Sequence, residues 1–224
     1  MNKATISADI ISSTSLNVEQ RLVLEEELVR LLDILKNTFG SKFFFGRLIK
    51  GDYIECVFER PKHALKAALL IKSYIKSLDI QPEKKDKETE DFRKHAIRIA
   101  IGVGKLSIWE KEKGIVDGEA IHFSGRAVNE MSTSNKKTKR TLVFRSGNEK
   151  WNKAMTPIFE LLDVLFAGYK TAQSEVVFHK LLGKSEKEIS ELLKKSRSTI
   201  NQHSTATGWS AVESAVRYFE NIIK

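Results

Sequence analysis

The stretch KFFFGRLIKGDYIECVF, residues 42–58, decides the fold. Two runs of aromatic and β-branched residues, Lys42–Ile49 and Tyr53–Phe58, flank the joint Lys50-Gly51-Asp52. Such runs favour extended strands, and a glycine-containing joint between them is typical of a tight turn. The stretch therefore predicts a β-hairpin with Asp52 at its tip.

Strand and helix patterns continue on both sides of this hairpin. The alternation of Ile97, Ile99, Ile101 and Val103 marks a half-buried strand. The order of elements predicts an α+β sandwich of the ferredoxin-like kind, in which helices cover one face of an antiparallel or mixed sheet. The expected elements are a strand at 3–9, a helix ending at 40, the hairpin, a helix at 61–78, a charged solvated loop at 81–95, a strand at 97–103, a helix at about 122–131 and a strand at 141–144.

The C-terminal third has a different pattern, because it is helical almost throughout. We therefore expect an α/β domain at 1–147, a linking helical region at 148–170 and an all-α domain at 171–224.

Composition narrows the class of protein. The 224 residues include 38 Lys and Arg against 29 Asp and Glu, a formal charge of +9, with 41% hydrophobic residues. No run of 18 apolar residues occurs, so no transmembrane helix and no membrane partner are expected. The single cysteine, Cys56, excludes a disulfide framework and suits a cytoplasmic protein. The positive charge permits a nucleic-acid partner, but much of the excess lies at 136–153.

Two acidic residues occupy privileged places in this plan. Asp9 ends the first strand and Asp52 lies at the hairpin tip, so the two carboxylates converge if the strands are neighbours. Such oxygen ligands suit Mg²⁺ or Mn²⁺. Water molecules and substrate phosphates then complete the coordination shell of the metal. We expect the helix that follows to begin at Ser12, Ser13 and Thr14. The backbone of these residues would then bind the phosphates. The alternative interpretation is that Asp9 caps a turn and Asp52 is an ordinary hairpin residue.

Three motifs in this order resemble class III nucleotide cyclases over about residues 1–145. Asp9-Ile10-Ile11-Ser12-Ser13-Thr14 is similar to their metal-binding Asp and phosphate loop, and Gly51-Asp52 to the hairpin that carries their second metal Asp. Gly125-Arg126-Ala127-Val128-Asn129 is similar to their Gly-x-x-Val-Asn helix. The resemblance implies a cyclase-like fold in which Asp9 and Asp52 are metal ligands. It also implies dimers with sites between subunits. The implied nucleotide contacts are Ser12, Ser13, Thr14 and the ribose-binding Asn129.

Three positions depart from the family pattern. Thr133 stands where the family has a transition-state arginine, and Leu48 and His122 replace its two base-reading residues. Phosphoryl transfer depends on positioning and charge stabilisation, so loss of that arginine costs orders of magnitude in rate. We therefore expect a degenerate domain that senses a nucleotide or metal, with an active cyclase as the alternative.

A second motif lies near the C-terminus. Ser185 and Glu188 have the spacing of a capping box, and Ile189 and Ile200 are spaced to pack two short helices across a tight turn. Residues 187–203 resemble bacterial helix-turn-helix regulators, although Lys194 replaces their turn glycine and Lys195 their usual apolar turn residue. The resemblance implies that the domain at 171–224 binds DNA.

The polar face of this unit supplies the expected DNA contacts. Arg, Asn and Gln pair with base edges in the major groove, while Lys and hydroxyl groups contact phosphates. A solvated helical hairpin without function is the alternative. The expected DNA-binding residues are Lys194, Lys195, Ser196, Arg197, Ser198, Asn201 and Gln202.

Together these patterns favour a dimeric, DNA-binding transcription regulator. A homodimer presents two recognition helices to a two-fold symmetric operator, and the cyclase-like domain biases their arrangement when it binds its ligand. The alternative is a divergent cyclase that makes a cyclic nucleotide with two divalent metals, and a third hypothesis is a dimeric scaffold.

Overall fold

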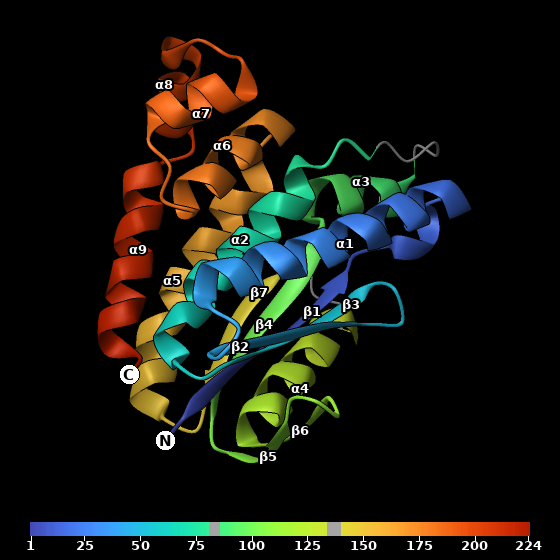
Figure 1. The fold of residues 1–224 in the computed structure, drawn as a ribbon, viewed down its shortest axis with the longest axis vertical. Helices are drawn as coiled ribbons and strands as arrows, with labels where there is room; N and C mark the ends of the chain where they lie inside the picture. The colour runs from blue at the N-terminus through green and yellow to red at the C-terminus, as the bar shows by residue number, and fades with distance from the viewer. Residues whose placement is uncertain (81–85, 134–139) are drawn as a thin grey trace.

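The computed structural model describes residues 1–80, 86–133 and 140–224. Within these ranges a five-stranded sheet has the order β2-β3-β1-β4-β7 (Figure 1). Adjacent strands of this sheet run antiparallel, except that β4 and β7 run parallel to each other. The strands are β1 (Lys3–Ile10), β2 (Phe44–Ile49), β3 (Tyr53–Phe58), β4 (Ile97–Gly104) and β7 (Leu142–Ser146), with β5 (Leu106–Glu110) and β6 (Ile115–Gly118) in a separate hairpin.

Helices follow the strands and then occupy the C-terminal third. In the described ranges none of them is both long enough and apolar enough to cross a membrane. Short 3-10 turns lie at Ser13–Ser15 and Pro61–His63. The helices are α1 (Val18–Phe39), α2 (Ala64–Ser77), α3 (Lys87–His95), α4 (Glu119–Thr133), α5 (Glu149–Gly168), α6 (Thr171–Leu181), α7 (Glu186–Leu193), α8 (Arg197–Ala206) and α9 (Trp209–Ile222).

The β2–β3 hairpin confirms the sequence prediction. Ile49 pairs with Tyr53, and the turn between them holds Lys50 at φ 54° and Gly51 at φ 79°. Two consecutive positive φ angles match the right-handed twist of the flanking strands, which is why glycine is favoured there. The tip therefore points Asp52 back toward the end of β1.

One face of the sheet forms the main hydrophobic core. Alternate residues of β1, Ala4, Ile6, Ala8 and Ile10, are buried there, as the two-residue period of a strand requires. Side chains of α1, α2, α5, α6 and α9 complete the same cluster. The C-terminal helices thus share a core with the sheet, and the Phe144 ring lies 5.7 Å from the rings of both Phe159 and Phe219.

The other face of the sheet carries α4, so the expectation that helices cover only one face is wrong. Ser124 of α4 lies within hydrogen-bonding distance of Thr5 (2.9 Å) and Ser7 (2.8 Å) of β1. The close approach needs glycine, because a Cβ on Gly102 would lie 2.1 Å from the Ala120 carbonyl oxygen. Asp9, two residues beyond Ser7 in β1, lies on this same face of the sheet.

The charged stretch 81–95 also differs from expectation. Residues 87–95 form α3. Its N-cap is Asp86, whose side chain accepts a hydrogen bond from the Thr89 N–H. Thr89, Phe92 and His95 are buried at helical spacing, a pattern that the surrounding charges conceal in the sequence. Residues 81–85 and most of the basic stretch 136–140 lie outside the described residues.

Candidate nucleotide and metal site

Asp9 and Asp52 lie at the same end of the central strands. Asp9 faces Tyr53 of β3 and Arg98 of β4 in the sheet register. The Ile10 N–H donates to the Asp52 carbonyl oxygen at 3.2 Å, which ties the hairpin tip to the end of β1. The structure therefore brings together the two carboxylates that the sequence singles out.

Each carboxylate already has a polar partner. The Arg98 guanidinium (Nη1) lies 2.9 Å from Asp9 Oδ2, and the Ser13 hydroxyl donates to Asp52 Oδ2 at 2.7 Å. Burial raises the pKa of Asp9, Arg98 opposes the rise, and the charge of Asp52 adds to it. The two acids therefore repel each other, and a divalent cation between them would relieve this repulsion.

The two carboxylates would fill only part of the coordination shell of a metal ion. In the described ranges no group of three or more His, Cys, Asp or Glu side chains gathers to hold a metal ion. Two carboxylates are enough for Mg²⁺, which keeps several waters and usually takes further oxygens from substrate phosphates. The residues present thus fit a metal that arrives with a phosphate-bearing ligand better than a resident one.

Ser12, Ser13 and Thr14 lie beside these carboxylates in a tight turn. Ser12 has the left-handed conformation at φ 54°, and the Ser15 hydroxyl donates to its carbonyl oxygen at 2.7 Å. The expectation that this stretch opens α1 is wrong. The N-cap is Asn17, whose side chain accepts from the Gln20 N–H at 2.8 Å.

Asn129 lies on α4, exposed, near its C-terminal end. The Asn129 carbonyl oxygen accepts a hydrogen bond from the Thr133 hydroxyl at 2.9 Å, so the side chain in the arginine position bonds back to the backbone of its own helix. His122 lies 3.0 Å from Asp117 of β6, through its Nε2 atom. Among the described residues, Asn129 forms no hydrogen bond or ion pair with Asp9 or Asp52 of the same chain.

Arg98 is the site residue that sequence reasoning missed. It occurs in the alternating strand of isoleucines, between Ile97 and Ile99, and therefore faces away from the core. That alternation was a usable signal, because it places a positive charge on the face opposite the core. The register that brings Arg98 opposite Asp9 depends on the pairing of β1 with β4, which one sequence does not reveal.

The second candidate site is the α7–α8 unit, at the end of the molecule away from the sheet (Figure 1). The predicted capping box of Ser185 and Glu188 is confirmed. Ile189 and Ile200 are buried together, as the spacing predicts. Lys194 ends α7 in the left-handed conformation at φ 52°, a position that glycine fills without strain.

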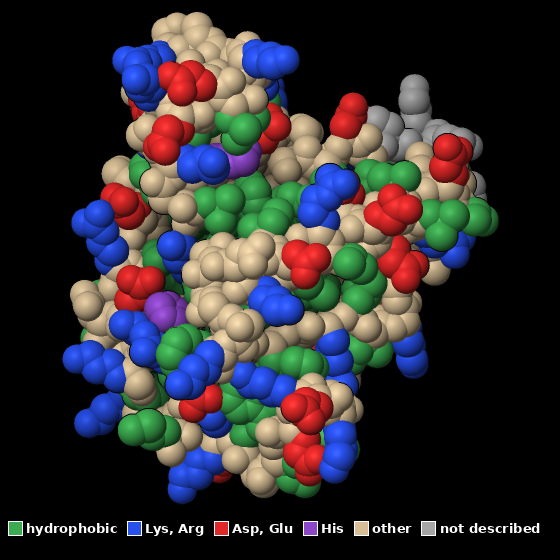
Figure 2. All heavy atoms as spheres, in the orientation of Figure 1, with side chains coloured by type: hydrophobic (Ala, Val, Ile, Leu, Met, Phe, Trp, Pro, Cys, Tyr) green, Lys and Arg blue, Asp and Glu red, His purple; other side chains and the backbone are tan. Residues whose placement is uncertain are grey.

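The predicted DNA-binding residues lie at and after this turn. Lys195 contacts Glu175 of α6 at 3.6 Å, and Asn201 donates to Glu186 of α7 at 3.4 Å. Basic and acidic side chains are interspersed over this end (Figure 2). The Ser196 side chain accepts from the Thr199 N–H as the N-cap of α8. The exposed members of the set are Lys194, Ser196, Arg197, Ser198, Asn201 and Gln202.

Comparison with known proteins yields distant likeness only. No protein-family model and no curated protein matches the chain. Two solved structures, each described as a bacterial light-regulated adenylyl cyclase, align with 59% of this chain. One has 16% identity, a TM-score of 0.43 and 41% of its own length covered. The other has 17% identity, a TM-score of 0.41 and 71% of its length covered. At this distance the function has to be inferred from the residues of this chain.

Proposed function

We propose that the chain binds a nucleoside triphosphate together with Mg²⁺ or Mn²⁺ at Asp9 and Asp52, and converts it into a cyclic nucleotide. The observation that supports this proposal is the convergence of the two carboxylates at the end of β1, beside the Ser12–Thr14 turn. A metal held by Asp9 and Asp52 would supply positive charge that stabilises the negative charge of the reacting phosphates.

The residues of this chain orient the triphosphate. Asp9 and Asp52 hold the metal–phosphate complex, and Arg98, released from Asp9, faces the phosphate charge. The ribose 3′ hydroxyl gives its proton to solvent and its oxygen attacks the α-phosphorus. The new ester bond closes the ring, and the bond from the α-phosphorus to the bridging oxygen breaks, so that pyrophosphate leaves. In the resembled family the site lies between two subunits, so Asn129 of a second copy completes it.

The reaction is expected to be slow. Thr133 offers no positive charge, and a transition-state arginine in phosphoryl transfer is worth about 10³–10⁵ in rate. Leu48 and His122 replace the two base-reading residues of the resembled family, so the pattern does not specify which nucleobase is preferred. All four triphosphates therefore belong in the assay.

The decisive experiment incubates the pure protein with each triphosphate and Mn²⁺, and measures nucleotide binding and cyclic product. We expect Mn²⁺-dependent binding, with product from one triphosphate, and loss of both in Asp52→Asn. The matched control is Asp33→Asn, an exposed carboxylate on α1. Binding without product would restrict the function to sensing, and equal behaviour of both variants would contradict the proposal.

A second proposed function is DNA binding by α8. The observation in its favour is that α8 buries Ile200 and Ser204 while Arg197, Asn201 and Gln202 remain exposed along it. This arrangement has the geometry of a recognition helix, whose first turns meet base edges in the major groove. The resemblance to cyclases implies a homodimer, which would place two copies of α8 on one duplex.

The test is salt-dependent binding to duplex DNA. Arg197→Ala and Gln202→Ala are each expected to cost about 1–3 kcal/mol on a selected sequence and to relax its specificity. The control is Arg217→Ala, an exposed arginine of α9 paired with Glu213. Binding that none of the three variants alters would exclude α8 as the reading element.

A further inference from the structure

A cavity of about 310 Å³ lies where the end of α2 meets α3 and the α5–α6 connection. Its wall combines apolar and polar side chains in about equal measure, and none of its lining residues in the described ranges is acidic. Three basic side chains and one threonine provide the polar lining. The lining residues are Ile75, Lys76, Leu78, Ile80, Phe92, Arg93, Ala96, Tyr169, Lys170 and Thr171.

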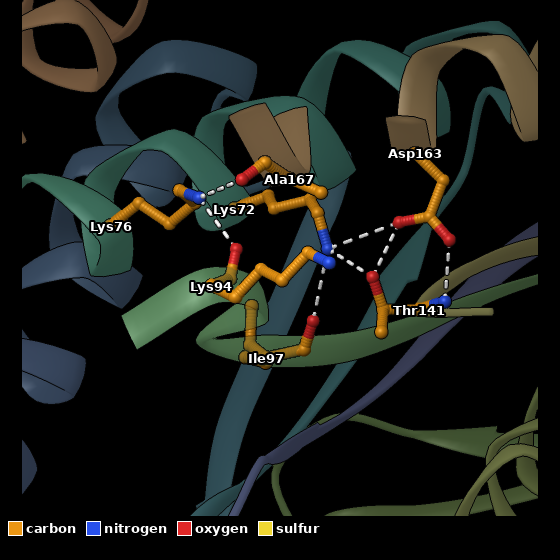
Figure 3. A network of polar contacts seen from close by, with 7 residues as sticks. All are labelled: Lys72, Lys76, Lys94, Ile97, Thr141, Asp163 and Ala167. Atoms are coloured by element: carbon orange, nitrogen blue, oxygen red, sulfur yellow. Dashed lines mark hydrogen bonds and ion pairs between the residues drawn. The ribbon is translucent and has the colours of Figure 1, made fainter. Parts of the chain in front are cut away.

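Lys76 is the most buried of the three basic side chains, at 7% exposure. Its ammonium donates to the Lys94 carbonyl oxygen at 2.6 Å and to the Ala167 carbonyl oxygen at 3.3 Å (Figure 3). These carbonyls belong to the last turns of α3 and α5, where helices leave acceptors unpaired. Two neutral acceptors satisfy hydrogen bonds but do not neutralise the charge.

The surroundings of this ammonium are also positive. Lys72 and Lys94 both disfavour its charge, and Asp163 alone opposes them. Asp163 is engaged elsewhere, since it lies 3.5 Å from Lys72 and accepts the Thr141 N–H at 2.6 Å. Burial and these neighbours lower the pKa of Lys76 to about 8. The cavity thus holds a buried cation without a carboxylate of its own.

We propose that this cavity binds a small amphipathic anion, a carboxylate on a hydrocarbon body. The carboxylate would pair with Lys76 and Lys170, and the hydrocarbon would replace water against Ile75, Ile80 and Phe92. A liquid water molecule fills about 30 Å³, so the cavity holds about ten heavy atoms. This number matches an eight-carbon carboxylic acid.

The position of the cavity connects this ligand to the C-terminal helices. Tyr169 and Lys170 form the connection from α5 to α6, and Thr171 begins α6. The Tyr169 hydroxyl donates to the Thr207 carbonyl oxygen at the end of α8. A bound anion therefore contacts the segment that carries α7 and α8. Its differential affinity for two positions of that segment would couple the cavity to α8.

The test is a calorimetric titration of the full chain with octanoate, octan-1-ol and octylammonium. We expect octanoate to bind at least tenfold more tightly than either analogue. Lys170→Glu, at an exposed position, is expected to weaken octanoate binding at least fivefold. Lys150→Glu, the same charge change on an exposed lysine at the start of α5, is expected to alter it less than twofold. Equal binding of octanol, or equal effects of the two variants, would overturn the proposal.

Proton uptake reports whether the anion lies next to Lys76. A neighbouring carboxylate raises the pKa of an ammonium, so at pH 8 binding should take up as much as about half a proton. Titrations in two buffers of different ionisation enthalpy measure this number. Octanoate binding without proton uptake would place the ligand elsewhere and refute the assignment. Lys76→Met should abolish the uptake, and circular dichroism would verify that the variant is folded.

Discussion

At the scale of the residue, the core contains a buried polar network around Lys72 whose members depend on one another for their hydrogen bonds. Lys72 is completely buried and donates to Thr141 Oγ1 at 2.7 Å and to the Ile97 carbonyl oxygen at 3.2 Å. Asp163 of α5 provides its counter-ion and also accepts the Thr141 hydroxyl (Figure 3). The network joins α2, two strand ends and α5, so each member is needed to satisfy the others.

Removing one charge from this network should be costly. Lys72→Met leaves Asp163 buried without its counter-ion, which we expect to lower the free energy of unfolding by about 3–5 kcal/mol. Urea unfolding measures the change. Lys153→Met, which breaks the exposed pair with Glu149, should change it by less than about 0.5 kcal/mol. Similar losses in both variants would show that burial of the pair is unimportant.

The lowered pKa of His95 should make the stability of the protein depend on pH. Burial, followed by repulsion from Lys72, lowers the pKa of His95 to about 4, against 6.5 for the free side chain. Between these values the unfolded chain binds the proton more readily, so stability is complete above pH 6.5 and falls as the pH drops toward 4. Urea midpoints between pH 7 and 5 measure the decline. His95→Gln should flatten this part of the curve, and an unchanged slope would rule His95 out as its source.

At the scale of the element, the contact between α4 and the sheet depends on glycine. Gly102 of β4 faces the backbone of α4, where a Cβ would lie 2.1 Å from the Ala120 carbonyl oxygen and 2.7 Å from the Ser124 nitrogen. Gly125, one residue further along the same helix, has no atom within 4 Å of its added Cβ. The two glycines therefore have opposite roles.

Alanine at these two positions provides a matched test. Gly102→Ala forces the helix away from the strand and should cost about 3 kcal/mol in unfolding free energy. Gly125→Ala should stabilise the protein by about 0.5–1 kcal/mol, because alanine loses less backbone entropy in a helix. Thermal unfolding of both variants measures the difference. A neutral Gly102→Ala would mean that α4 does not lie this close to β4.

Local sequence rules predicted most individual elements. The hairpin at Lys50-Gly51, the end of α1 at Gly40 and the Ser185 cap are short-range features, and the structure confirms each. Lys194 weakened the helix-turn-helix pattern, yet it adopts the left-handed conformation expected of the usual glycine. Local backbone chemistry was therefore a reliable guide even where the residue type departed from the pattern.

Long-range features were less accessible. The helix α3 was missed because its buried positions, Thr89, Phe92 and His95, are separated by charged residues. The place of α4 on the second face depends on sheet pairing, which no local pattern records. The convergence of Asp9 and Asp52 was anticipated from topology, whereas the Arg98 partner required the register of β1 with β4.

At the scale of the whole molecule, the sheet and the C-terminal helices share one hydrophobic core. Phe219 of α9 is completely buried, and its ring meets that of Phe144 in an edge-to-face arrangement. Phe159 of α5 lies against both rings. Loss of packing in α9 should therefore affect the sheet directly.

Phe219→Ala should destabilise the entire chain rather than the last helix alone. We expect a loss of about 3–5 kcal/mol, with Trp fluorescence and far-ultraviolet circular dichroism reporting the same urea midpoint. Tyr218→Ala, a partly exposed neighbour on α9, should cost much less. Two separate transitions in Phe219→Ala would show that the helices and the sheet unfold independently.

The shared core also sets an order of events at the ribosome. Strand β7 leaves the ribosome well before α9, and at about 5–20 residues per second the interval between Phe144 and Phe219 lasts roughly 4–15 s. During that time Phe144 and Phe159 lack one of their aromatic neighbours and are open to water or to a chaperone. The hydrophobic core beneath the sheet is thus completed only when α9 has been synthesised.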